Sequence, residues 1–120
     1  MHEANKAAPL NTASLISTNS LWTISYGYVE AICQQAAGPD FWPAWWLDGQ
    51  SWPADWEINV LEDDGGNDGA YHCHNPAGGP GASVSVPGAT TGFHSYAAHI
   101  TPASVSFSLF FLWLNSFEIG

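Results

Sequence analysis

The sequence predicts an all-β protein, folded as an antiparallel β-sandwich or jelly roll. Short segments rich in β-branched and aromatic residues recur at about ten-residue spacing, which is typical of such folds. Twelve glycines and eight prolines are spread through the 120 residues and separate these segments. No segment carries a long apolar stripe of helical period. All three observations favour strands over helices.

The expected strands follow one another along the chain. Side chains of residues 21–35 alternate between two faces, as the two-residue period of a strand requires. The stretches 36–40 and 63–69 are rich in Gly, Pro, Asp and Asn, which indicates turns. Further strands are expected, in chain order, over residues 41–47, 56–62, 70–74, 83–86, 93–100 and 104–111.

Charge excludes two classes of partner. Eleven acidic residues stand against the single basic residue Lys6, which gives a formal net charge of −10 at pH 7. Without a basic patch the chain cannot neutralise nucleic-acid phosphates or dock on an anionic membrane. The most apolar stretch, residues 105–114, is about half the length needed to span a bilayer. The first residues show no basic region followed by an apolar one, so no secretory signal is expected.

Two cysteines leave the redox state open. Cys33 and Cys73 lie 40 residues apart in the sequence and form no CxxC pattern. They form a disulfide if the chain is exported and the fold brings them together, or they remain buried thiols. The count of two decides neither alternative.

The segment EINVLE at 57–62 carries the most informative acidic residues. On a regular strand Glu57 and Asn59 share one face and Glu62 lies on the other. A β-bulge at 60–61 would return Glu62 to the first face. Two carboxylates would then lie about 5 Å apart, which suits a retaining glycosidase. The alternative is that both glutamates simply face solvent.

Tryptophans precede this segment in unusual density. Five of them occur within fifteen residues: Trp42, Trp45, Trp46, Trp52 and Trp56. The flat faces of their indole rings suit stacking on sugar rings. The alternative role is core packing. Alternation within 41–47 separates Trp42 and Trp46 from Trp45, so at least one of the two sets is expected in the core.

Two further clusters are candidate ligand sites. His72 and His74 are two residues apart, so they share a face of the strand at 70–74 and either line a groove or contribute to a metal site. Groove lining is the favoured interpretation. The acidic turn at 63–68 lacks the spacing of an EF-hand, which favours a solvated turn over a calcium site. No metal or cofactor is therefore expected.

Several motifs together resemble glycoside hydrolase family 16, the laminarinase and β-glucanase group. YGYVEA at 26–31 is similar to the family's YGxxEAR strand, and GPDFWPAWWL at 38–47 to its GxGLWPAFWL segment. WP at 52–53 followed by EINVLE resembles its WP…GEIDIxE signature. FHSYA at 93–97 and TPASVSF at 101–107 resemble its FHTYxxxWTPDSIxF pair. The combination is much more specific than the spacing of the two glutamates alone.

The resemblance implies a concanavalin A-like β-sandwich, present as a partial domain over residues 10–107. Residues 1–9 are expected to form an N-terminal tail, and residues 108–120 have no recognisable origin. The implied activity is that of an extracellular retaining endo-β-glucanase on β-1,3 or β-1,3/1,4 linkages. By the family pattern Glu57 is the nucleophile and Glu62 the acid/base. The implied contacts to the β-glucan are Trp42, Trp46, Trp52, Trp56, His72 and His74.

Asn59 is the main departure from the family pattern, which has Asp at this position. An amide still donates a hydrogen bond to Glu57, but it cannot carry a negative charge or share a proton. Asn59 should therefore still position Glu57, while the rate of hydrolysis falls. Two alternatives remain: a non-catalytic glucan-binding module and an inactive fragment.

Overall fold

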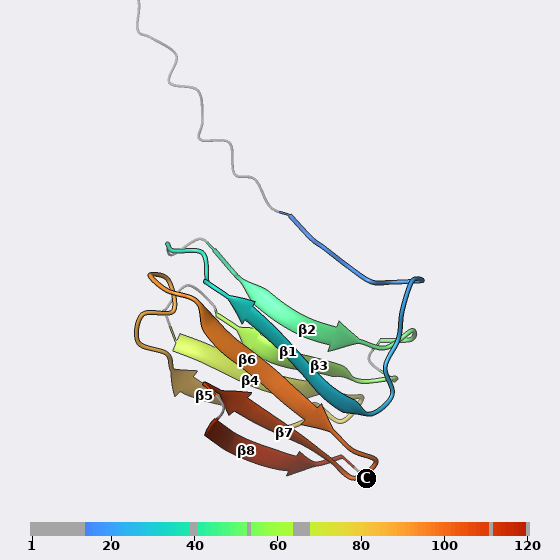
Figure 1. Ribbon diagram of the computed structural model, residues 1–120. Helices are drawn as coiled ribbons and strands as arrows, with labels where there is room; N and C mark the ends of the chain where they lie inside the picture. Colours follow the sequence, from blue (N-terminus) through green and yellow to red (C-terminus); the bar gives the residue numbers. More distant parts are fainter. Residues whose placement is uncertain (1–13, 39–40, 53, 64–67, 111, 120) are drawn as a thin grey trace, which may run out of the picture.

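The computed structural model describes residues 14–38, 41–52, 54–63, 68–110 and 112–119. These residues form eight strands and no helix, so none of them belongs to a helix fit to cross a bilayer. The strands make two four-stranded antiparallel sheets that stack on each other (Figure 1). The predicted all-β sandwich is thus confirmed, while the tail expected at 1–9 lies outside the described residues.

Each sheet has a simple strand order. One sheet, in the order β1-β6-β7-β8, contains β1 (Gly27–Cys33), β6 (His94–Ile100), β7 (Ser104–Leu109) and β8 (Leu112–Glu118). The other, in the order β2-β3-β4-β5, contains β2 (Ala44–Asp48), β3 (Glu57–Glu62), β4 (Asp68–His74) and β5 (Gly81–Ser85). The second sheet carries the candidate site.

The expected strands are found close to their predicted positions, with two differences. β1 begins only at Gly27, whose φ of +133° interrupts the extended chain that was expected from residue 21. β8 was not expected at all. It pairs with β7 through a tight turn at Phe110, whose φ is +52°. Such turns usually carry Asn or Gly, so a phenylalanine there gives no turn signal.

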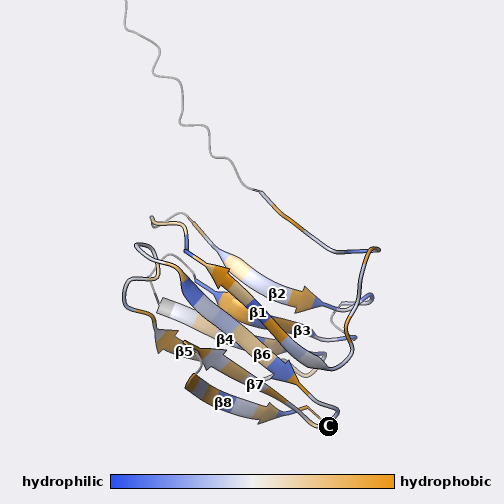
Figure 2. Cartoon of the chain, viewed as in Figure 1, coloured by the Kyte–Doolittle hydropathy of each residue, from blue (hydrophilic) through white to orange (hydrophobic). Residues whose placement is uncertain are grey.

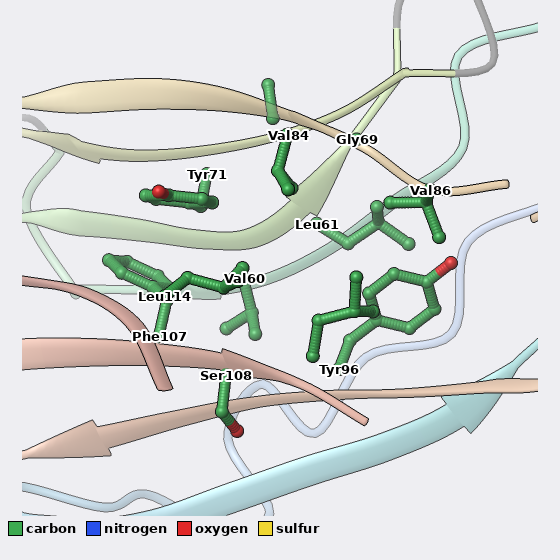
Figure 3. Close-up of a pocket in the computed structure, with 12 residues that line it drawn as sticks. Val60, Leu61, Gly69, Tyr71, Val84, Val86, Tyr96, Phe107, Ser108 and Leu114 are labelled. Atoms are coloured by element: carbon green, nitrogen blue, oxygen red, sulfur yellow. The ribbon is translucent and has the colours of Figure 1, made fainter. Parts of the chain in front are cut away.

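The core lies between the two sheets. Tyr71 of β4 stacks on Phe107 of β7 with ring centroids 4.8 Å apart, which ties the sheets together. Figure 3 shows the side chains that meet around this stack, where only about 10 Å³ of cavity remains. Such a volume is roughly that of a single water probe. Apolar and polar residues alternate along several strands (Figure 2), as expected when one face of each sheet is buried.

Both cysteines are free thiols. Cys73 of β4 is fully buried, and burial raises its pKa to about 11. Cys33 is half-buried, and burial raises its pKa as well. Of the two alternatives left open by the sequence, the structure therefore has free thiols, of which Cys73 is buried and Cys33 half-buried.

Candidate active site

A β-bulge in β3 organises the outer face of the second sheet. Asn59 pairs with His72 of β4, but Glu62 pairs with Ala70, so three steps on β3 match two steps on β4. The pairing with β2 is irregular at the same place. Val60 and Leu61 are both buried, so two consecutive residues face the core. The bulge predicted at 60–61 is confirmed.

The bulge places three polar side chains on one face of the sheet. Glu57 and Asn59 share this face by normal alternation, and the extra residue returns Glu62 to it. Asn59 is buried, and its Nδ2 donates a hydrogen bond of 2.8 Å to Glu57 Oε1. The amide therefore holds one oxygen of the Glu57 carboxylate in place.

Glu62 has different partners. Its Oε1 accepts a hydrogen bond of 2.9 Å from the indole Nε1 of Trp42, and its Oε2 lies 3.0 Å from Nδ1 of His72. Trp42 is mostly exposed, so this indole lies beside Glu62 at the open surface. One carboxylate is thus held by an amide and the other by an indole and an imidazole. Unequal surroundings of this kind allow two carboxylates to take different roles.

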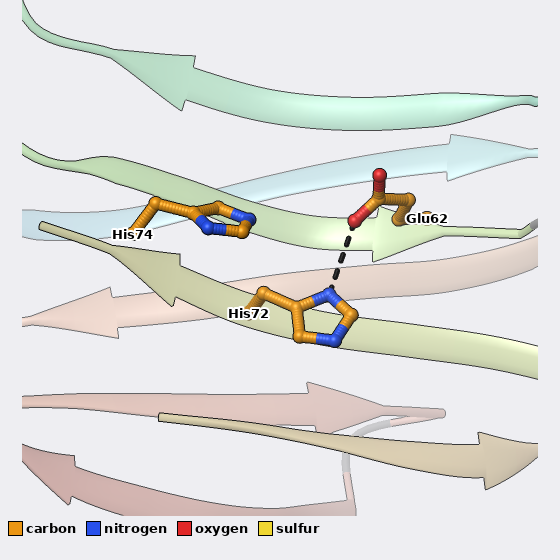
Figure 4. A group of neighbouring side chains, drawn as sticks. All are labelled: Glu62, His72 and His74. Carbon is orange, nitrogen blue, oxygen red and sulfur yellow. Dashed lines mark hydrogen bonds and ion pairs between the residues drawn. The ribbon is translucent and has the colours of Figure 1, made fainter. Parts of the chain in front are cut away.

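The two histidines lie beside the carboxylates, on the neighbouring strand β4. Nε2 of His74 is 4.0 Å from Glu57 Oε1, and the imidazole centroids of His72 and His74 are 5.7 Å apart (Figure 4). His72 pairs with Gly81 of β5. A Cβ at position 81 would come within 2.1 Å of Cδ2 of His72, so glycine leaves room for the ring. The sequence offered no signal for this contact, because the β4–β5 register was unknown.

The tryptophans divide between the surface and the core. Trp46 lies opposite Asn59 on the same sheet face and is partly exposed, while Trp45 packs against the core. This is the division that alternation predicted. Trp52 is exposed in the loop between β2 and β3. Trp56, expected at the sugar-binding face, instead packs partly against the core.

Trp42 and Trp46 also border a shallow groove. Its volume is about 500 Å³, and the residues that line it also include Leu15 and Gln34. The two indoles therefore lie next to open space as well as next to the carboxylates.

Fold and site together define a class: a concanavalin A-like jelly roll with a carboxylate pair on the outer face of one sheet. No family model matches the chain. A β-glucanase from Rhodothermus marinus is 32% identical in an alignment that covers 87% of this chain and 41% of that protein. The chain thus spans about two fifths of the length of the curated relative it matches.

Solved structures agree with this relationship. The laminarinase from Rhodothermus marinus superposes with a TM-score of 0.77 at 27% identity, covering 85% of this chain and 47% of that one. A non-specific endo-β-1,3(4)-glucanase of family GH16, crystallised with a glucan oligosaccharide, gives 0.77 at 25% identity, covering 84% and 44%. The chain is therefore related to the laminarinases and β-glucanases of glycoside hydrolase family 16 over part of their length.

Proposed function

We propose that this chain carries the catalytic centre of a retaining endo-β-glucanase acting on β-1,3 or mixed β-1,3/1,4 glucans. The observation that supports this most directly is the bulge in β3, with Glu57 and Glu62 on one sheet face beside exposed tryptophans. The relatives are named as β-glucanase, laminarinase and endo-β-1,3(4)-glucanase. The family resemblance implies that the enzyme acts outside the cell.

The proposed reaction has two steps. Glu57 attacks the anomeric carbon while Glu62 gives its proton to the leaving glycosidic oxygen. Glu62 then removes a proton from water, whose oxygen displaces Glu57 from the sugar; this restores the Glu57 carboxylate and the protonated Glu62. Asn59 positions the nucleophile through its 2.8 Å hydrogen bond. His72, through its contact with Glu62, orients the acid/base.

Substrate binding is assigned to the surface around the carboxylates. Trp42 and Trp46 offer exposed indole faces next to them, and Trp52 offers another in the adjoining loop. Trp56 supports this loop, since its carbonyl accepts a hydrogen bond from Gly49 N. His72 and His74 contribute ring nitrogens that can bond sugar hydroxyls.

Hydrolysis of laminarin and lichenan by the purified chain, followed by released reducing ends, tests the proposal. Glu57→Gln and Glu62→Gln should each lower kcat by roughly 10³-fold or more, because each removes a group that reacts. Glu118→Gln, at an exposed position on β8 of the other sheet, is the matched control and should keep the wild-type rate. NMR should show the β-anomer as the first product. Unchanged hydrolysis by Glu57→Gln would contradict the assignment of the nucleophile.

A non-catalytic glucan-binding module is the second candidate, and Asn59 is the observation that favours it. If the amide limits the rate, Asn59→Asp should raise kcat by roughly tenfold or more, since a carboxyl group can share a proton with Glu57. Binding of laminarin without turnover, in both the wild type and Asn59→Asp, would favour the binding module instead.

A further inference from the structure

Glu62, His72 and His74 form a three-residue cluster on the outer face of the second sheet. Each offers one ligand atom, and these three atoms all lie within 4.8 Å of one another (Figure 4). The exposed side-chain fractions are 22% for Glu62, 36% for His72 and 40% for His74. An ion placed among them would therefore keep contact with water.

The sheet itself brings the three groups together. His72 and His74 are alternate residues of β4 and project from the same face. Glu62 joins them only because of the bulge in β3. Gly81 of β5, which pairs with His72, leaves space for the His72 ring. All three side chains stand on paired strands rather than loops, so the cost of organising them around an ion is small.

The donor set selects the kind of ion. Two imidazole nitrogens with one carboxylate oxygen suit zinc and related transition metals, whereas calcium and magnesium prefer oxygen ligands throughout. Zinc ligands in tetrahedral geometry lie roughly 3.3 Å apart, so the imidazoles must turn inward from their present positions. The net charge of −10 also favours a cation near the surface.

The geometry points to a zinc-type site formed by Glu62, His72 and His74, whose occupation switches hydrolysis off. This inference departs from the expectation of no metal, and its inhibitory half rests on the proposed function. The ion would take the Glu62 carboxylate that otherwise donates and accepts the proton. It would also replace the 3.0 Å contact between Glu62 and His72. Metal binding and catalysis then exclude each other.

Metal binding is tested without any substrate. Titration of the untagged chain with Zn²⁺ in a calorimeter should give one site with a dissociation constant below roughly 10 μM. Co²⁺ in place of Zn²⁺ should give visible absorption bands of a nitrogen- and oxygen-bound ion. His72→Gln, His74→Gln and Glu62→Gln should each weaken binding at least tenfold. His99→Gln, an exposed histidine on β6, is the matched control and should bind as the wild type does.

Gly81→Ala gives a second test that leaves all three ligands in place. Its Cβ would displace the His72 ring, so zinc affinity should fall while circular dichroism remains that of the folded protein. Equal zinc affinity in the wild type and in His74→Gln would overturn the site.

Inhibition is measured separately on laminarin. Micromolar Zn²⁺ should abolish hydrolysis, and EDTA should restore it fully. Zinc binding in a chain that never hydrolyses glucan would refute the proposed function and leave the metal site standing. Full hydrolysis with zinc bound would overturn the inhibitory role alone.

Discussion

Asn59 connects the two sides of the candidate site at the scale of single residues. It pairs with Trp46 on β2 and with His72 on β4, and its side chain holds Glu57. A buried amide with a carboxylate partner is well satisfied, so position 59 tolerates the loss of charge structurally. Asn in place of the family's Asp at position 59 is therefore expected to lower the rate of hydrolysis rather than the stability of the fold.

Cys73 makes the stability of the fold depend on pH. Burial raises its pKa from the ordinary 9.0 to about 11, so the folded chain keeps a proton that the unfolded chain releases. The contribution of the protonated Cys73 thiol to the free energy of unfolding is complete below pH 9 and is lost as the pH rises towards 11. The expected loss in the free energy of unfolding across this window is about 2 kcal/mol.

Urea unfolding at several pH values between 8 and 11 measures this loss. Cys73→Ala is the comparison variant and should show a flatter dependence on pH. The pKa values of Cys33 and Tyr96 are also raised, both mainly by burial, but they contribute equally to both proteins. Parallel curves for the two proteins would contradict the role given to Cys73.

At the scale of elements, β8 contributes to the core although no motif in its sequence predicted a strand there. Phe117 lies 6.1 Å from both Tyr71 and Phe107, measured between ring centroids, and Asn115 donates a hydrogen bond to the Tyr71 hydroxyl. Residues of β8 therefore extend the central aromatic stack. The strand is part of the sandwich rather than an appendage.

Phe117→Ala should lower the free energy of unfolding by about 2 kcal/mol, because a partly buried ring is lost beside the central stack. Leu112→Ala, at an exposed position of the same strand, should change it by about 0.5 kcal/mol or less. Chemical denaturation of both variants provides the measurement. Equal stability of the two variants would mean that β8 does not support the core.

The strands that could be predicted share one property: a clear two-residue period between recognisable turns. β3 and β6 are examples, and even the bulge followed from the spacing of Glu57 and Glu62 with the motif around them. β8 could not be predicted, because its turn contains Phe110 in a conformation usually taken by Asn or Gly. The contact of Trp42 with Glu62 and the space at Gly81 depend on strand register, which sequence alone does not supply.

At the scale of the whole molecule, the excess of acidic groups opposes compaction. With a net charge of −10 and one lysine, the mutual repulsion of the acidic groups is relieved mainly by counterions. Raising sodium chloride from 10 to 200 mM shortens the screening length from about 30 Å to about 7 Å. The thermal midpoint at pH 7 should therefore rise by a few degrees, as calorimetry can measure.

The same salt step at pH 4.3 is the control for charge repulsion. The sequence pI is about 4.3, so the net charge is near zero there and the midpoint should not change. An equal rise at both pH values would assign the effect to general exclusion of salt from the protein surface.

Because of the bulge in β3, the proposed chemistry depends on the backbone geometry between Glu57 and Glu62 as well as on the residues themselves. Five positions separate Glu57 from Glu62, an odd number that an ordinary strand would assign to opposite sides. A change that straightened β3 without altering its length would preserve both glutamates in the gene and yet turn one of them towards the interior. A homologue that keeps both glutamates at this spacing but lacks the bulge would contain the key residues and still be inert.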